Sequence, residues 1–188
     1  MPARATHWLL AFSALVAVSF FCIGLTSYFE RRPDKPLWVR GIHDAGMLLS
    51  LVHLGAVFLL EPRSDAFGVA GLMMYTAAVA LFLSAIEAAR RTRLQRAFVD
   101  LPLPERLITD GPYRWVRHPF YLGYIIGALA PMVSLDHMVV FVVSALMVLM
   151  TVTAAFREEQ VWLSSPRADA YREYRRRTGM FVPKLWRR

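Results

Sequence analysis

The 188-residue chain is poor in cysteine and in acidic residues. Its one cysteine, Cys22, excludes an intramolecular disulfide and a metal site built on several thiolates. Asp and Glu number 14 against 22 Lys and Arg, so the formal net charge is +8. Charged residues make up 19% of the chain, whereas hydrophobic residues make up 56%. A chain of this size with so apolar a composition is typical of a membrane domain rather than of a soluble one.

The hydrophobic residues gather into long runs. A helix needs about 20 apolar residues to cross the hydrocarbon core of a bilayer. The runs cover approximately residues 7–29, 41–60, 66–89, 120–135 and 138–156. Only Asp136 and His137 separate the last two, which predicts a tight antiparallel helical hairpin. We therefore predict an all-α, polytopic membrane protein with about five transmembrane helices.

These helices are expected to form a single integral-membrane domain over residues 1–188. Residues 1–65 carry the first two helices, and residues 66–188 carry the third helix and the C-terminal half. His53 lies near the middle of the second run. Because an ionisable side chain inside a membrane needs a polar partner, we expect this histidine to bond to a neighbouring helix.

The positive charges are distributed unevenly between the two ends of the predicted helices. Twenty of the 22 Lys and Arg follow helices one, three or five, whereas Arg4 and Arg63 lie at the opposite end. Basic residues collect on the cytoplasmic side, so the N-terminus is predicted outside and the C-terminal segment in the cytoplasm. We expect the location to be the bacterial inner membrane. Attraction to anionic membrane lipids explains the same charge, so no nucleic-acid partner is expected.

The stretch GPYRWVRHPFYLG, residues 111–123, combines turn, basic and aromatic residues where the loop enters the fourth helix. Pro119 suits the first turn of that helix, so the helical amides, with Arg117 and His118 beside them, could bind an anionic group. Aromatic faces for stacking or for attracting a cation come from Tyr113, Trp115, Phe120 and Tyr121. The alternative interpretation is an interfacial belt of aromatic residues and arginine.

A second polar cluster, Arg-Glu-Glu at 157–159, follows the last apolar run. Two acids beside an anionic leaflet require a positive partner. The predicted hairpin supplies one, because it places the Glu158 end of helix five beside the His118 end of helix four. Two interpretations remain open. One is a two-part ligand pocket, and the other is an ion pair from Glu158 or Glu159 to Arg114 or Arg117.

Three segments together resemble a known family. GPYRWVRHPFYLG, REEQVWL at 157–163 and YREYRRRTGMFVP at 171–183 are similar to the integral-membrane methyltransferases grouped with isoprenylcysteine carboxyl methyltransferase and the phospholipid N-methyltransferases. The resemblance covers about residues 86–183 and implies S-adenosylmethionine as cofactor, held at the cytoplasmic ends of the last helices and capped by the C-terminal segment. The positions that match the cofactor motif are Tyr113, Arg117, His118, Pro119, Tyr121 and Gly123, and those that match the acidic pair are Glu158 and Glu159.

The function implied is methyl transfer to a small lipophilic or lipid-linked acceptor at the cytoplasmic membrane face. If the acceptor is a neutral amine or thiol it needs a general base, and His118 and Glu159 are the catalytic candidates. Isoprenylated cysteine, a phospholipid amine, a small thiol and a carboxylate all remain open as acceptors. Two alternatives are an NADPH-dependent membrane sterol or lipid reductase, and a non-enzymatic membrane partner whose C-terminal arginines dock lipid or protein.

Overall fold

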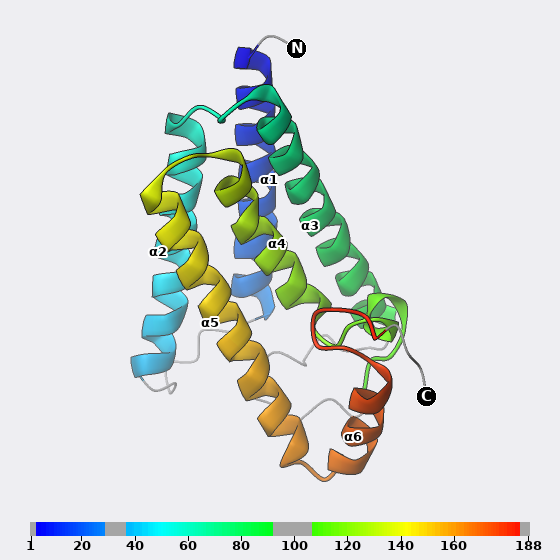
Figure 1. Ribbon diagram of the computed structural model, residues 1–188. Helices are drawn as coiled ribbons and strands as arrows, with labels where there is room; N and C mark the ends of the chain where they lie inside the picture. Colours follow the sequence, from blue (N-terminus) through cyan, green and yellow to red (C-terminus); the bar gives the residue numbers. More distant parts are fainter. Residues whose placement is uncertain (1–2, 29–36, 92–106, 185–188) are drawn as a thin grey trace.

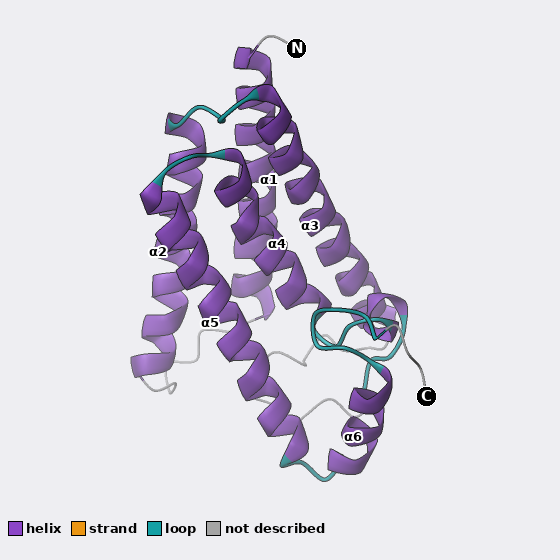
Figure 2. Ribbon diagram, in the orientation of Figure 1, coloured by secondary structure: helices purple, strands orange, loops and turns teal. Residues whose placement is uncertain are grey.

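The computed structural model describes residues 3–28, 37–91 and 107–184, and every regular element in these ranges is helical (Figure 2). The α-helices are α1 (Ala3–Tyr28), α2 (Leu37–Leu59), α3 (Asp65–Arg91), α4 (Pro119–Ser134), α5 (Met138–Leu163) and α6 (Ala168–Arg177). A short 3-10 helix, η1 (Gly111–Arg114), precedes α4. The prediction of an all-helical fold is confirmed.

Three helices are long and apolar enough to cross a membrane. The qualifying segments are Arg4–Ile23 of α1, Asp65–Ala89 of α3 and Met138–Leu163 of α5. Segment Asp44–Leu59 of α2 and helix α4 are apolar but shorter. This pattern supports an integral membrane protein.

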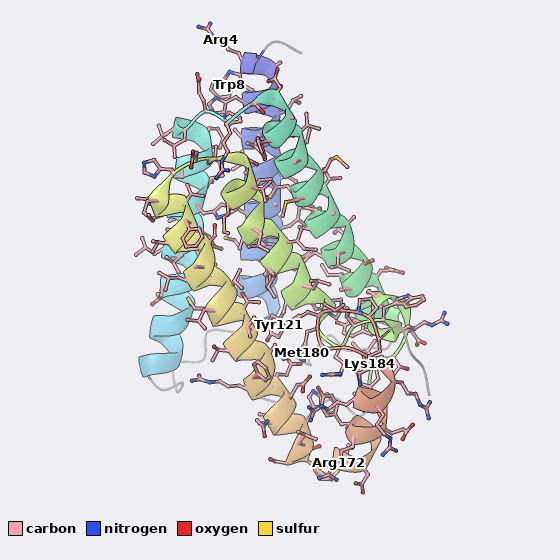
Figure 3. All side chains as sticks on the ribbon, in the orientation of Figure 1. Arg4, Trp8, Tyr121, Arg172, Met180 and Lys184 are labelled. Atoms are coloured by element: carbon pink, nitrogen blue, oxygen red, sulfur yellow. The ribbon has the colours of Figure 1, made fainter. Side chains whose placement is uncertain are left out.

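The first five helices lie side by side and alternate in direction, whereas α6, η1 and residues 178–184 gather at one end of the bundle (Figure 1). Helix α3 packs against α1 and α4, and α5 packs against α4 and α2. Buried alanines are frequent on α1 and α3, for example Ala14 and Ala78, and small residues let helix backbones approach closely. Arg4 and Trp8 lie at the end opposite Arg172 and Lys184 (Figure 3).

Polar contacts also join elements of the bundle away from the basic end, among them one between the His7 imidazole of α1 and the carbonyl of Val57 of α2, 3.1 Å apart. His53 of α2 and Tyr75 of α3 are both buried, and the imidazole Nε2 lies 2.7 Å from the tyrosine hydroxyl. The expectation that His53 bonds to another helix is confirmed. At the end of the bundle opposite the basic end, the guanidinium of Arg63 lies 3.5 Å from the carboxylate of Asp136. The backbone amide of Arg63 donates to the carbonyl of Ser134. These contacts join the α2–α3 turn to the α4–α5 turn.

The Phe21 ring of α1 packs against α4 at Gly127. A Cβ atom added at Gly127 would lie 2.6 Å from the Phe21 ring, which also packs against the rings of Phe82 and Tyr124. We therefore expect Gly127→Ala to lower stability by about 1–3 kcal/mol, the usual penalty for overfilling a packed core. A thermal melt of the variant in detergent measures this loss, and a melting temperature equal to that of the wild type would contradict it.

Helix α5 extends beyond its apolar run. The last apolar run ends near Phe156, but α5 continues to Leu163. Glu158 and Glu159 therefore lie in the polar C-terminal part of α5, the end at which the sequence placed them. The physical reason is that Arg, Glu and Gln are good helix formers, so the backbone ladder continues after the apolar residues stop. Residues 29–36 and 92–106, which hold many of the basic residues used to predict orientation, lie outside the described part of the chain.

Candidate functional site

The C-terminal strap, defined here as residues 178–184, lies against the loop that leads into α4 (Figure 1). Val116 and Gly179 form a parallel β-bridge. The amide of Arg117 donates to the carbonyl of Gly179 at 2.8 Å, and the amide of His118 donates to the carbonyl of Met180 at 3.3 Å. The strap is thus fixed directly onto the residues of the predicted cofactor motif.

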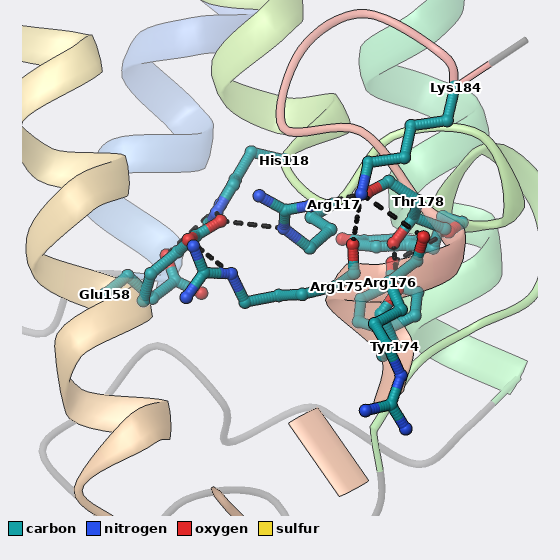
Figure 4. Close-up of polar contacts among 10 residues, drawn as sticks. Arg117, His118, Glu158, Tyr174, Arg175, Arg176, Thr178 and Lys184 are labelled. Carbon is teal, nitrogen blue, oxygen red and sulfur yellow. Dashed lines mark hydrogen bonds and ion pairs between the residues drawn. The ribbon is translucent and has the colours of Figure 1, made fainter. Parts of the chain in front are cut away.

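Arg117, His118 and Arg175, labelled in Figure 4, share one partner, the buried carboxylate of Glu159 of α5. Its side chain is 3% exposed. Arg117 donates from Nε to Oε1 at 2.7 Å, and the Nε2 of His118 lies 3.3 Å from the same oxygen. The other oxygen, Oε2, faces the Nε of Arg175 at 3.3 Å. Burial of a charge is tolerated when it is paired and hydrogen-bonded, as it is here.

The His118 ring lies between the two acids of α5. Its Nε2 faces Glu159, and its Nδ1 lies 4.0 Å from an oxygen of Glu158. The Tyr121 ring stacks at 5.5 Å between centroids, and the Phe181 ring of the strap lies at 6.0 Å. The imidazole therefore has a carboxylate near each ring nitrogen, a stacked tyrosine ring and a tilted phenylalanine ring.

Two tyrosines of α6, Tyr171 and Tyr174, lie beside this network. Tyr171 stacks on Trp162 with ring centroids 5.5 Å apart, and the Tyr174 hydroxyl donates to the carbonyl of Tyr113 at 2.7 Å. Burial raises the pKa of both phenols, so both remain neutral at physiological pH. The Tyr171 hydroxyl is buried and has no hydrogen-bond partner in the described part of the chain. A buried unpaired hydroxyl is costly, and a ligand group would satisfy it.

The structure brings together five of the residues nominated from the sequence. Arg117, His118, Tyr121, Glu158 and Glu159 meet at the basic end of the bundle. The antiparallel order of α4 and α5 accounts for this, because the start of one helix lies beside the end of the other.

The other three nominated residues have neighbours outside this network. Tyr113 is buried against α3 and offers its backbone carbonyl to α6. Pro119 is the buried first residue of α4. Gly123 faces α3, where an added Cβ would lie 3.2 Å from the carbonyl of Ala78. Their contacts here are with the protein itself, and they shape the loop and the α3–α4 packing.

The sequence interpretation missed Arg175, the Tyr171 hydroxyl and the backbone of the strap. Tyr171 and Tyr174 are three residues apart and so share one face of a helix, a spacing that signals α6. Spacing indicates Arg175 only by elimination, because its neighbouring arginines each have an acid three or four residues away on α6.

These contacts contain the ion pair that one interpretation of the acidic pair expects, and the ligand pocket stays a prediction. The ion pair to Arg117 is present, and it is made by Glu159. It is also part of a larger network with an unpaired hydroxyl nearby, which a simple ion pair does not require. Trp115 is 55% exposed, as the interfacial-belt alternative expects for that residue.

A family model described as phospholipid methyltransferase matches residues 66–166, more than half of the chain. The chain belongs to the phospholipid methyltransferase family. The matched segment runs from α3 to the end of α5 and includes the motif loop and both acids of the network. Membership of this family supports methyl transfer and an enzyme, and it favours neither the reductase nor the non-enzymatic alternative.

Three relatives are similar to part of this chain. Protein-S-isoprenylcysteine O-methyltransferase of Schizosaccharomyces pombe is 32% identical over 79 residues, which cover 42% of this chain and 34% of that protein. Methanethiol S-methyltransferase 1 of Bradyrhizobium diazoefficiens is 33% identical over 86 residues, which cover 45% and 28% of the two chains. Methanethiol S-methyltransferase of Mycobacterium tuberculosis is 38% identical over 72 residues, 38% of this chain and 28% of that protein. The matches thus span about a third or less of each relative, and no solved structure matches.

Proposed function

We propose that this phospholipid methyltransferase family member uses S-adenosylmethionine to methylate a small lipophilic or lipid-linked acceptor at the cytoplasmic membrane face. The observation that carries the proposal is the buried Glu159, which meets Arg117, His118 and Arg175 at one end of a bundle of apolar helices. This is the part of the chain where the sequence motif resembles the family's cofactor motif.

The side chains of the network fit the chemistry of this cofactor. S-Adenosylmethionine has an ammonium, a carboxylate, ribose hydroxyls, an adenine ring and a sulfonium. The network offers carboxylates from Glu158 and Glu159, guanidinium groups, and the aromatic faces of Tyr121 and Phe181. The unpaired hydroxyl of Tyr171 provides a buried polar atom that a ligand would satisfy. When bound, the cofactor supplies a methyl group activated by the adjacent sulfonium.

The chain's own task in such a transfer is mainly to align the two reactants, because the displacement is in line and needs no covalent protein nucleophile. Glu159 is held by two guanidinium groups, so we assign it to orienting the ligand. The Nδ1 of His118 lies 4.0 Å from Glu158, beyond hydrogen-bond distance, so we assign proton acceptance to His118 for acceptors that need it.

For the membrane arrangement, we propose five spans, with α2 and α4 crossing beside the three longer apolar helices and α4 and α5 forming a hairpin. The basic end of the bundle, with the strap and α6, is assigned to the cytoplasm and the N-terminus to the outside, in the bacterial inner membrane. The whole chain is assigned to one domain. An acceptor dissolved in the bilayer would then reach the network from between the helices.

The acceptor is proposed from the chemistry named for the relatives. Their names specify an isoprenylated cysteine and methanethiol, a lipid-linked and a small volatile acceptor. Both are lipophilic, which agrees with a site at the end of membrane helices. Mass spectrometry of a membrane extract incubated with the protein and isotopically labelled S-adenosylmethionine identifies the acceptor as the species that gains one labelled methyl group.

A ligand-induced shift in melting temperature tests the cofactor. S-Adenosylhomocysteine at about 100 times its dissociation constant should stabilise the purified protein by about 2.7 kcal/mol, because it binds the folded state alone. NADPH under the same conditions should have no effect. Stabilisation by NADPH alone would favour the reductase, and a folded protein that responds to neither ligand would refute the proposed cofactor.

A further inference from the structure

Arg175 differs from its neighbours on α6 in where it finds its partner. Arg172 pairs with Asp169, and Arg176 and Arg177 pair with Glu173, all within the same helix. Arg175 instead reaches across to α5, where its Nε lies 3.3 Å from Oε2 of Glu159. Its side chain is 40% exposed, although its partner is 3% exposed. Arg175 therefore connects the protein surface to the buried carboxylate.

The other donor groups around Glu159 already make hydrogen bonds within the protein. Arg117 is 7% exposed, bonds to Oε1 of Glu159 and donates from Nη1 to the carbonyl of Thr178. The amides of Arg117 and His118 donate to the strap. The two amides directly before α4, which the sequence placed beside an anion site, therefore serve the strap. Removal of Arg117 from Glu159 would break several buried contacts at once.

Of the contacts made by Glu159, the one with Arg175 is the contact that a ligand could replace most easily. It is longer than the contact made by Arg117, 3.3 Å against 2.7 Å, and its arginine is the more exposed. Glu159 keeps Arg117 and His118 on Oε1 when Arg175 moves away. Oε2 then becomes available to an ammonium group, and the guanidinium of Arg175 becomes available to a carboxylate.

We propose that the zwitterionic amino-acid end of the cofactor inserts between Glu159 and Arg175, with its ammonium on Oε2 of Glu159 and its carboxylate on the guanidinium of Arg175. This inference rests on the proposed function. The exchange replaces one ion pair by two and leaves no buried charge unpaired, which is the condition for burying charged groups at acceptable cost. A planar guanidinium is well suited to bind a carboxylate through two hydrogen bonds.

Two thioethers of adenosine test this assignment, because they differ in the amino-acid end. S-Adenosylhomocysteine carries the ammonium and the carboxylate, and 5′-methylthioadenosine lacks both. We expect Arg175→Met to lower the affinity for S-adenosylhomocysteine by about 10- to 100-fold, the usual loss for one charge-assisted contact. Its affinity for 5′-methylthioadenosine should stay within about twofold of the wild type, and Arg175→Lys should recover part of the loss. Isothermal titration in nanodiscs measures all of these affinities.

Arg172→Met is the matched control, because Arg172 is 55% exposed and pairs only with Asp169 of its own helix in the described part of the chain. It should bind both ligands like the wild type. Three results for Arg175→Met would overturn the assignment: an equal loss of affinity for both ligands, no change in either affinity, or a higher affinity for S-adenosylhomocysteine. A wild-type protein that binds neither ligand would refute the proposed cofactor as well, so the two failures are distinguishable.

Discussion

Glu159→Gln should abolish ligand binding at the network and lower the free energy of unfolding by about 3–5 kcal/mol, the usual result of removing one partner from a buried ion pair. Glutamine has nearly the same shape, so packing is preserved while the negative charge is lost. Arg117, which is 7% exposed, would then be left without a counter-ion on that side. We expect the affinity for S-adenosylhomocysteine to fall by at least about 100-fold, since the ammonium also loses its carboxylate.

Denaturation of the purified protein, followed by tryptophan fluorescence, and isothermal titration of the refolded variant measure the two effects separately. Glu173→Gln is the control, because Glu173 also pairs with two arginines but on the exposed face of α6. Exposed ion pairs are worth about 0–1 kcal/mol, so this variant should remain close to the wild type in stability. If Glu159→Gln and Glu173→Gln have equal stabilities, the network does not stabilise the fold.

The meeting of Arg117 with the acidic pair could be predicted from the sequence, but the identity of the acid could not. A short connection between two apolar helices makes them antiparallel, and this alone places residue 117 near residues 158 and 159. Which acid faces the loop depends on the rotation of α5 about its own axis. Successive residues differ by about 100° in a helix with 3.6 residues per turn, so Glu158 and Glu159 point in different directions. The structure directs Glu159 inward and leaves the Glu158 side chain 35% exposed.

The role of Arg175 could not be predicted for a related reason. Arg172, Arg175, Arg176 and Arg177 look alike in the sequence, and local spacing offers acids three or four residues away to three of them. The phase of α6 is set by burial of Tyr171 and Tyr174. Arg175 follows Tyr174 directly, and only the packing of α6 beside α5 shows that it reaches Glu159.

The strap was the element least accessible to sequence reasoning, because its attachment is made by backbone atoms. Carbonyl groups of residues 178–180 accept hydrogen bonds from the loop before α4, and every residue type carries such a group. Lys184 adds a further contact, from its Nζ to the carbonyl of Arg175 at 2.7 Å. The resemblance to a family implied a C-terminal cap, but the position of that cap follows from these contacts.

Gly179→Ala should detach the strap while leaving the membrane helices folded. A Cβ atom at position 179 would lie 1.6 Å from the carbonyl oxygen of Val182, a separation that no backbone tolerates, so the turn between the two residues must open. Opening moves the carbonyls that bind the amides of Arg117 and His118 and the guanidinium of Arg117. Loss of about three hydrogen bonds, one of them charge-assisted, should lower the affinity for S-adenosylhomocysteine by about 100- to 1,000-fold.

Limited digestion with trypsin reports the position of the strap independently of ligand binding, because Arg177 directly precedes the strap and Lys184 is its last residue. We expect rapid cleavage after Arg177 in Gly179→Ala and slow cleavage in the wild type. Gly55→Ala is the matched control, since an added Cβ there meets nothing within 4 Å and alanine favours the helix. Retained affinity together with rapid cleavage would show that the network binds its ligand without the strap. Slow cleavage with lost affinity would place the defect within the network itself, because the strap would still be attached while Arg117 or His118 had moved.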